Sequence, residues 1–396
     1  MGIPHFLCIP YPVQGHVNPL VQFSLALAKH GCKVTFLHTE FSLKRDNTAA
    51  SANNFEGSQM KVVTLPDGLG PEDDRSDMAK VILSIKNTMP ARLPKLIEYG
   101  LGFGNCSQTR DQRLPTKNQA IQLSPNMPTI DTQNFPWRGF NKTLFEHIVQ
   151  EMQTSELGEW WLCNTVYDLE PEAFSLSPKF LPIGPLVESD SNLSSFWQED
   201  TTCLEWLDQQ SPKSVVYVSF GSLATVEPNQ FKELALGLDL IDKPFIWVVR
   251  PSNDNKKVNA NAYPHEFLGS KGKIVGWAPQ KKILSHPAIA CFISHCGWNS
   301  TLEGVCAGVP FLCWPFVSDQ YLNKSYICDV WKIGLGLEKD ENGIISREEI
   351  KKKVDQLVSD KVIKARSLKW KEMIINNIVE GGQSSKNLNF FIDWAK

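Results

Sequence analysis

The sequence predicts an α/β protein with two parallel sheets, each in its own Rossmann-like half. Short apolar runs that suit buried strands alternate with segments of helical periodicity, first over residues 5–37 and again from residue 214 onward. Between the two series, residues 184–200 are rich in Ser, Asp and Asn, as a linker would be. The chain has 396 residues, which suits two domains better than one.

The N-terminal half is expected to open with a strand over residues 5–10 and a helix over residues 18–30. Residues 11–17 between them would form a loop, and a second strand is expected over residues 33–37. Pro19 would then lie in the first helical turn, where proline is tolerated because an N–H at that place has no partner within the helix.

The C-terminal half repeats this rhythm. A strand is expected over residues 214–220, a helix over residues 228–240 and a strand over residues 245–249. Further strands are expected in the rest of this half, at residues 273–276, 289–294, 311–314 and 333–337. The last helix, at about residues 385–394, is amphipathic enough to pack back on the body.

These elements divide the chain into four parts. Residues 1–185 are expected to form the first domain, which is irregular over residues 98–118. Residues 186–200 link it to a second domain at residues 201–380, and residues 381–396 contain the returning helix. In open parallel sheets ligands bind at the carboxyl ends of the strands, so a site is expected in the crevice there.

Composition excludes several classes of protein. The net charge of −3 and the pI of about 6.3 give no sign of binding to nucleic acid or to an anionic membrane. No apolar run approaches the roughly 18 residues of a membrane span, and the N-terminus lacks the features of a signal peptide. The ten cysteines form no C-x-x-C pair, which is typical of a reducing compartment. We therefore expect a cytoplasmic protein.

Residues 277–320 contain the most informative pattern in the chain. A buried strand ends at His295, Gly297 permits close backbone approach, and a helix opens at Asn299 and Ser300. This arrangement places free backbone N–H groups and the positive end of a helix where an anion can bind. The imidazole of His295 can donate to a phosphate.

Other side chains of the block suit a nucleotide sugar. Trp277 offers a flat face for a base. Glu303 lies one helical turn after Ser300 and can accept from the two hydroxyls of a ribose. Asp319 and Gln320 present an acceptor and an amide that suit sugar hydroxyls.

Each of these residues also has a structural explanation when it is taken alone. A tryptophan such as Trp277 is more often core, and Ser300 could simply cap a helix. Cys291, His295 and Cys296 could suggest a metal, but a set of four ligands is missing, so no metal is expected. The whole set supports the nucleotide-sugar reading, not any one member.

The block resembles, over its full length, the donor-binding signature of the plant secondary-product UDP-glycosyltransferases. These belong to glycosyltransferase family 1 and have the GT-B fold, with two Rossmann-like domains that face each other across a cleft. The resemblance implies a UDP-sugar co-substrate, with UDP-glucose favoured by the final Gln320, and no cofactor. It assigns uracil to Trp277 and Ala278, ribose to Gln280 and Glu303, diphosphate to Ser222, His295, Asn299 and Ser300, and hexose to Trp298, Asp319 and Gln320.

Residues 11–19 resemble the N-terminal loop of the same family, in which a histidine removes the proton of the acceptor. The resemblance implies that His16 is the general base of a direct displacement with inversion at the anomeric carbon. A bare histidine before a helix would otherwise be an exposed or capping imidazole. The implied acceptor is a hydroxyl or carboxyl of a small hydrophobic plant metabolite, such as a flavonoid, and no partner protein is implied. The chain contains no Asp-x-Asp motif, which fits a transferase without a metal.

One part of the family pattern is missing. In the family an aspartate on an N-terminal strand orients the base histidine, and neither this strand nor the aspartate occurs here. Ordinary codons for residues 99–112, read one base later, can encode a segment that closely resembles the family's helix after the aspartate. We therefore predict that splicing, or an incorrect gene model, removed the aspartate strand, put its helix out of frame and removed the next strand–helix unit. Asp111 lies in this irregular stretch and is not expected to replace the aspartate.

The sequence is consistent with three candidate functions. The first is a UDP-glycosyltransferase with activity impaired by the lost aspartate, and the second is a homologue that binds UDP-sugar without catalysis. The third is an NAD(P)-dependent oxidoreductase, for which residues 100–104 contain three glycines at alternate positions but lack the last glycine of G-x-G-x-x-G.

Overall fold

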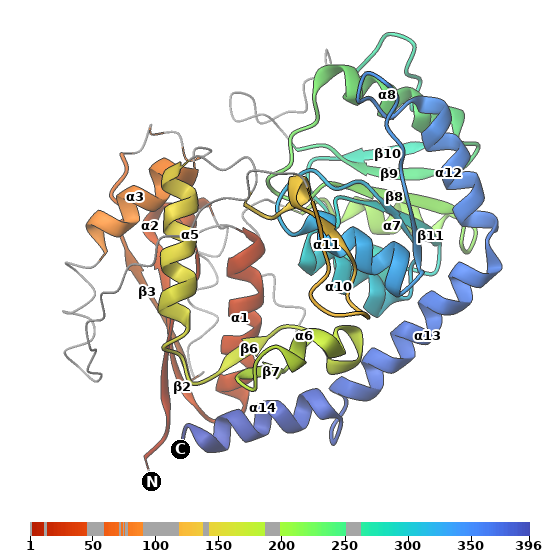
Figure 1. Cartoon of the computed structure of the whole chain (residues 1–396). Coiled ribbons are helices and arrows are strands. Elements are labelled where there is room, and N and C mark those ends of the chain that lie inside the picture. The colour runs from red at the N-terminus through yellow and green to blue at the C-terminus, as the bar shows by residue number, and fades with distance from the viewer. Residues whose placement is uncertain are drawn as a thin grey trace.

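The computed structural model describes residues 2–11, 14–45, 59–70, 73, 75, 78–89, 119–137, 142–186, 199–250 and 263–396. Two groups of parallel strands lie side by side, with helices around them (Figure 1). The predicted α/β class with parallel sheets is therefore confirmed. Within the described ranges, no helix combines the length and the apolar character that a membrane crossing requires.

The N-terminal half contains a three-stranded parallel sheet in the order β1-β2-β3. Its strands are β1 (His5–Cys8), β2 (Lys33–Thr39) and β3 (Met60–Leu65). Helix α1 (Gln14–Lys29) packs its apolar face on this sheet, since its buried Val17, Val21 and Leu27 share a cluster with residues of β2.

Further elements complete this half. The helices are α2 (Glu40–Arg45), α3 (Met78–Thr88), α5 (Lys142–Ser155) and α6 (Pro171–Ser175), with short turns of 3-10 helix at Thr132–Asn134 and Tyr167–Leu169. The strands β4 (Ala120–Ile121) and β5 (Ile130–Asp131) pair antiparallel, and β6 (Trp161–Cys163) pairs parallel with β7 (Phe180–Pro182). The predicted irregular stretch at residues 98–118 lies outside the described residues.

Within the described residues, strand β1 has a partner on one of its two edges. It pairs with β2, and no strand within the described residues pairs with its other edge. In a parallel α/β sheet both edges of an inner strand are paired, because its N–H and C=O groups need partners. The loss of a strand from this half stays a prediction, because residues 90–118 lie outside the described residues.

Helix α1 corrects the expected loop and helix start. It begins at Gln14, four residues before the expected position, so His16 lies in the first turn of the helix and Pro19 lies inside it. Because proline has no N–H, the carbonyl of Gly15, four residues earlier, loses its helical partner. The side-chain amide of Asn299 donates to this carbonyl instead, at 2.6 Å.

The C-terminal half is built on a six-stranded parallel sheet in the order β10-β9-β8-β11-β12-β13. Its strands agree with the expected ones to within a residue or two: β8 (Val215–Ser219), β9 (Phe245–Val248), β10 (Gly272–Val275), β11 (Ile289–Ser294), β12 (Phe311–Cys313) and β13 (Gly334–Gly336). Its helices are α7 (Thr202–Asp208), α8 (Pro228–Leu240), α9 (Gln280–Ser285), α10 (Trp298–Ala307), α11 (Gln320–Ser325) followed by a π turn (Tyr326–Val330), α12 (Arg347–Ser359), α13 (Lys361–Ile378) and α14 (Gln383–Trp394).

The strand order places a ligand crevice in this half. The chain adds β9 and β10 on one side of β8, and then β11, β12 and β13 on the other side. The order therefore reverses between β8 and β11, and in doubly wound sheets ligands bind at the carboxyl ends of the strands at such a point. Both strands are fully buried, with apolar clusters on both faces of the sheet, so the loops that follow them rest on a rigid base.

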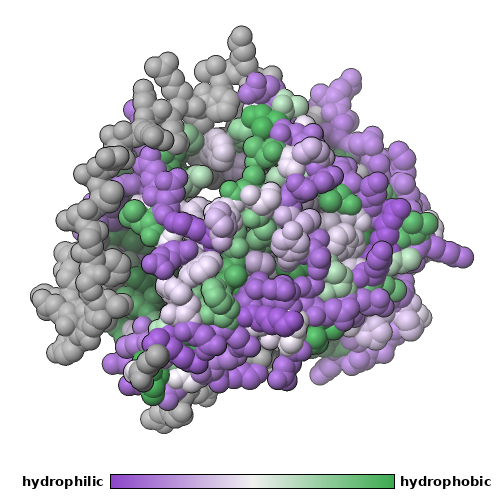
Figure 2. All heavy atoms as spheres, turned by 60° about the horizontal axis from the view of Figure 1, so that its bottom comes forward, coloured by the Kyte–Doolittle hydropathy of each residue, from purple (hydrophilic) through white to green (hydrophobic). Residues whose placement is uncertain are grey.

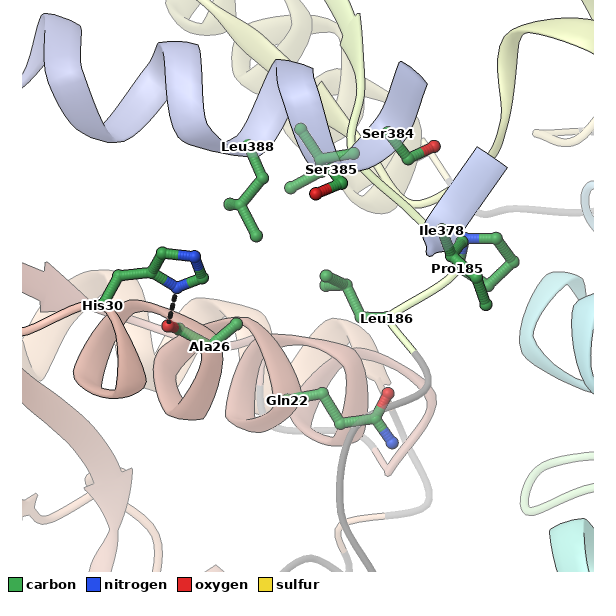
Figure 3. A pocket seen from close by; sticks show the side chains of 10 residues that line it. Gln22, Ala26, His30, Pro185, Leu186, Ile378, Ser384, Ser385 and Leu388 are labelled. Carbon is green, nitrogen blue, oxygen red and sulfur yellow. Dashed lines mark hydrogen bonds between the residues drawn. The ribbon is translucent and has the colours of Figure 1, made fainter. Parts of the chain in front are cut away.

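Helix α14 crosses from the C-terminal half back to the N-terminal one (Figure 1). Its Phe391 ring lies 5.8 Å from that of Phe6 on β1, and Asn387 donates to the carbonyl of Pro182 at 2.7 Å. Hydrophilic residues prevail on the face that carries this helix, with hydrophobic ones between them (Figure 2). A small pocket lies between α14 and α1, where Leu388 and His30 face each other across it (Figure 3).

Candidate functional site

The imidazole of His295 lies between two glycines at the carboxyl ends of β8 and β11. A Cβ on Gly221 would lie 2.6 Å from His295 Nε2, and a Cβ on Gly297 would lie 2.5 Å from the same atom. Real Cβ atoms do not approach so closely, so both positions need glycine. Gly221 also has a φ of +68°, which glycine adopts at little cost. The two turns therefore clamp the imidazole beside the first turn of α10.

The loop between β11 and α10 is held in an uncommon conformation by Asn323. Cys296 has a φ of +65°, and its N–H bonds to the hydroxyl of Ser294 at 3.1 Å. Asn323, which is 4% exposed, donates to the carbonyl of Cys296 at 2.9 Å and to the carboxylate of Asp319 at 2.8 Å. Asn323 was not predicted from the sequence, although its position four residues after Asp319 indicates a shared helical face.

His295 is neutral at physiological pH. Burial lowers its pKa to about 4, and the positive charge of Arg250 acts in the same direction, while a backbone hydrogen bond with Ser219 opposes the shift. A neutral imidazole has one N–H, with which it can donate to a phosphate oxygen.

The depressed pKa of His295 predicts a loss of stability in acid. The unfolded chain binds the extra proton below about pH 6.5, so this contribution to the free energy of unfolding is complete above pH 6.5 and decreases as the pH falls toward 4. At pH 5 we expect a loss of about 2 kcal/mol. Urea unfolding at pH 7 and pH 5 measures it. The free energy of unfolding of a His295→Gln variant should decrease less between pH 7 and pH 5. A decrease equal to that of the unmodified chain would show that other groups cause the effect.

Gln280, Ser300 and Glu303 come together in one hydrogen-bonded group. The amide nitrogen of Gln280 donates to the hydroxyl of Ser300 and to the carboxylate of Glu303, both at 2.8 Å. Its oxygen accepts from the hydroxyl of Tyr217 at 3.1 Å. Burial raises the pKa of Glu303, and the bond from Gln280 partly offsets this. The free acceptor positions of the Glu303 carboxylate can receive hydroxyl groups of a ribose.

Trp277 and Ala278 lie beside this group, in the loop that leads into α9. Ala278 is 6% exposed and belongs to the core, whereas Trp277 is only partly buried. The carbonyl of Trp277 accepts from the N–H of Asp200 at 2.9 Å, which attaches the loop to the start of the C-terminal half.

The residues expected at the hexose have structural contacts as well. The indole N–H of Trp298 donates to the carbonyl of Asn164, in the N-terminal half, at 2.9 Å. The Gln320 side chain is buried, and its oxygen accepts from the N–H groups of Phe316 and Val317 at 2.8 and 3.1 Å. Asn164 was not found from the sequence, because only its main chain takes part in this contact.

His16 lies in the first turn of α1, next to Gly15, whose carbonyl accepts from Asn299 in the C-terminal half. Its side chain is exposed, with the ring of Tyr11 at 5.5 Å. Nearby protein still removes enough water to lower the pKa of His16, and the negative charge of Asp319 opposes this shift. His16 is therefore neutral at pH 7 and able to accept a proton. Within the described residues, no carboxylate accepts a hydrogen bond from it.

Ser222 lies in the turn after β8, and Arg250 holds this turn by hydrogen bonds. The guanidinium donates to the carbonyls of Ser222 and Ala224. Ser222 was predicted from the sequence, but Arg250 was not, because its partners lie 28 and 26 residues away along the chain. In the part of the chain that the structure describes, no three His, Cys, Asp or Glu side chains are placed to hold a metal.

Known proteins resemble this chain in sequence and in fold. The family described as "UDP-glucoronosyl and UDP-glucosyl transferase" matches residues 112–376. UDP-glycosyltransferase 83A1 of Arabidopsis thaliana is 39% identical over all of this chain and 97% of its own length. Linamarin synthase 1 of Manihot esculenta is 30% identical, with 98% of this chain and 96% of its own length covered.

Solved structures show the same fold. Os79 from O. sativa, in complex with UDP, has a TM-score of 0.82 at 24% identity and covers 98% of this chain and 100% of its own. Medicago truncatula UGT71G1, complexed with UDP-glucose, has a TM-score of 0.81 at 24% identity and covers 99% and 98%. The GT-B fold, with two Rossmann-like domains, is thus confirmed. The strand-end site and these matches together identify the chain as a member of the plant UDP-glycosyltransferases of glycosyltransferase family 1.

Proposed function

We propose that this chain binds UDP-glucose through the residues that the sequence pattern assigns, and that its transfer of glucose is weak or absent. The observation that supports binding is the position of His295, the Ser222 turn and the start of α10 at the switch point between β8 and β11. These groups offer N–H donors to two phosphates, and Trp277 lies beside them for the base. The assigned donor residues are Ser222, Trp277, Ala278, Gln280, His295, Trp298, Asn299, Ser300, Glu303, Asp319 and Gln320.

The proposed chemistry is one displacement at the anomeric carbon with inversion. The neutral imidazole of His16 takes the proton from the acceptor hydroxyl, whose oxygen bonds to the anomeric carbon while the bond from that carbon to UDP breaks. His295 and the N–H groups at the start of α10 stabilise the negative charge that develops on the diphosphate. We infer that the acceptor is a small hydrophobic plant metabolite, such as a flavonoid, and that the protein is cytoplasmic. The domain limits at residues 185, 200 and 380 belong to the same proposal.

A second candidate is a homologue that binds UDP-sugar without transfer. It is favoured by the absence, within the described residues, of a carboxylate that bonds to His16. It is also favoured by the second edge of β1, with which no described strand pairs. The nicotinamide alternative has no such support, since its glycines at residues 100–104 lie outside the described residues and the family match assigns the chain elsewhere.

Calorimetry with UDP tests the proposed site. We expect Trp277→Ala and His295→Ala each to weaken UDP binding by about tenfold or more, because each removes a main contact to the base or the diphosphate. Trp394→Ala is the matched control, since this tryptophan is 49% exposed on α14. If both site variants bound UDP as well as the unmodified chain, the assignment would be wrong. An assay for glucoside and free UDP, with UDP-glucose and a flavonol, separates the two candidate functions.

A further inference from the structure

Arg250 lies two residues after the end of β9 and contacts the turn that follows β8. One guanidinium nitrogen donates to the carbonyl of Ser222 and the other to the carbonyl of Ala224. A planar guanidinium donates to two carbonyls from two nitrogens whose relative positions are fixed, whereas an ammonium group offers a single nitrogen. Arg250 thereby determines where the chain runs after Gly221.

This turn is part of the proposed diphosphate site. Gly221 lies against the ring of His295, because a Cβ there would come within 2.6 Å of Nε2. Ser222, which accepts a hydrogen bond from Arg250, therefore directly follows Gly221, which packs against the imidazole of His295. The positive charge of Arg250 also reaches His295, since it contributes to the lowered pKa of this histidine.

The side chain of Arg250 is only partly exposed, and the loss of water lowers its pKa. Among the residues that the structure describes, no carboxylate lies within ion-pair distance of it. The desolvation of a cation is unfavourable when no anion offsets it. A diphosphate at His295 would bring such an anion close to Arg250.

We propose that Arg250 is a positioning residue for the diphosphate of the donor, through the turn that it holds and through its charge. This inference rests on the proposed UDP site. It predicts that the contribution of Arg250 is specific to the phosphates and leaves the recognition of uridine unchanged.

Calorimetry with UDP and with uridine tests this. For Arg250→Met we expect UDP binding to weaken by about tenfold or more, the size typical for loss of hydrogen bonds to a charged group, while uridine binding stays within about twofold. Arg250→Lys keeps the charge without the two-pronged geometry and should lie between. The pKa of His295, followed by NMR, should rise in Arg250→Met, which a purely structural role would not produce.

Arg347→Met is the matched control. This arginine also makes a partly buried contact in the same half, with Glu233 at 2.5 Å, but away from the donor site. It should lower stability and leave UDP binding unchanged. If the unmodified chain did not bind UDP, the proposed function itself would fail. If it bound UDP and Arg250→Met bound UDP equally well, or lost uridine to the same extent, only the role of Arg250 would be refuted.

Discussion

Restoring the missing internal segment is expected to raise glucoside formation by about 10²–10⁴-fold. The alignment with the Arabidopsis relative spans 463 positions against 396 residues here, so about 67 positions of that protein have no counterpart in this chain. In a chimera, residues 90–118 are replaced by the corresponding segment of that relative. The graft should supply a strand beside β1 and a carboxylate that orients His16.

The physical reason is the state of His16. Its pKa is already low enough for a base at pH 7, but no described carboxylate holds its ring or stabilises the imidazolium that forms during transfer. Such positioned proton transfer accounts for the expected gain. The measurement is turnover of UDP-glucose with a flavonol, for the unmodified chain and the chimera.

Two controls separate catalysis from folding in this experiment. Changing the grafted aspartate to asparagine should remove most of the gain while the strand remains. His16→Ala in the chimera should do the same. If the unmodified chain already turned over at the rate of the chimera, the proposed impairment would be incorrect.

Gly297→Ala is expected to weaken UDP binding by about 100-fold. The added methyl would lie 2.5 Å from Nε2 of His295, so either the imidazole or the start of α10 must move. Gly297 has a φ of −61°, which alanine adopts without strain, so the effect comes from space alone. Overpacking of a tight site costs roughly 1–3 kcal/mol, and the upper end of this range corresponds to about 100-fold in affinity.

Gly15→Ala is the matched control for this substitution. Gly15 lies in the first turn of α1, and among the described residues an added Cβ would meet Asn299 Nδ2 alone, at 3.9 Å. Its UDP binding and stability should stay close to those of the unmodified chain. If Gly297→Ala bound UDP as tightly as the unmodified chain, the close packing of the two glycines around His295 would not matter for binding.

Much of the C-terminal half could be predicted from the sequence. Its strands are short and fully buried, so apolar runs marked them clearly, and β8 and β11 lie where they were expected. The start of α1 was not predictable in the same way, because Pro19 suggested a helix start and instead lies inside the helix. The contact that compensates for Pro19 comes from Asn299, 284 residues away from Gly15.

The sequence by itself determined the chemical types that gather in the block from Trp277 to Gln320, since local spacing and strand–turn–helix order are written along the chain. Only the tertiary structure decided how these groups are held. The clamp on His295, the bond from Asn323 to Cys296 and the support of Ser222 by Arg250 join residues that are distant in sequence. Such contacts depend on which strand ends lie side by side in the sheet, and a local sequence pattern does not indicate this order.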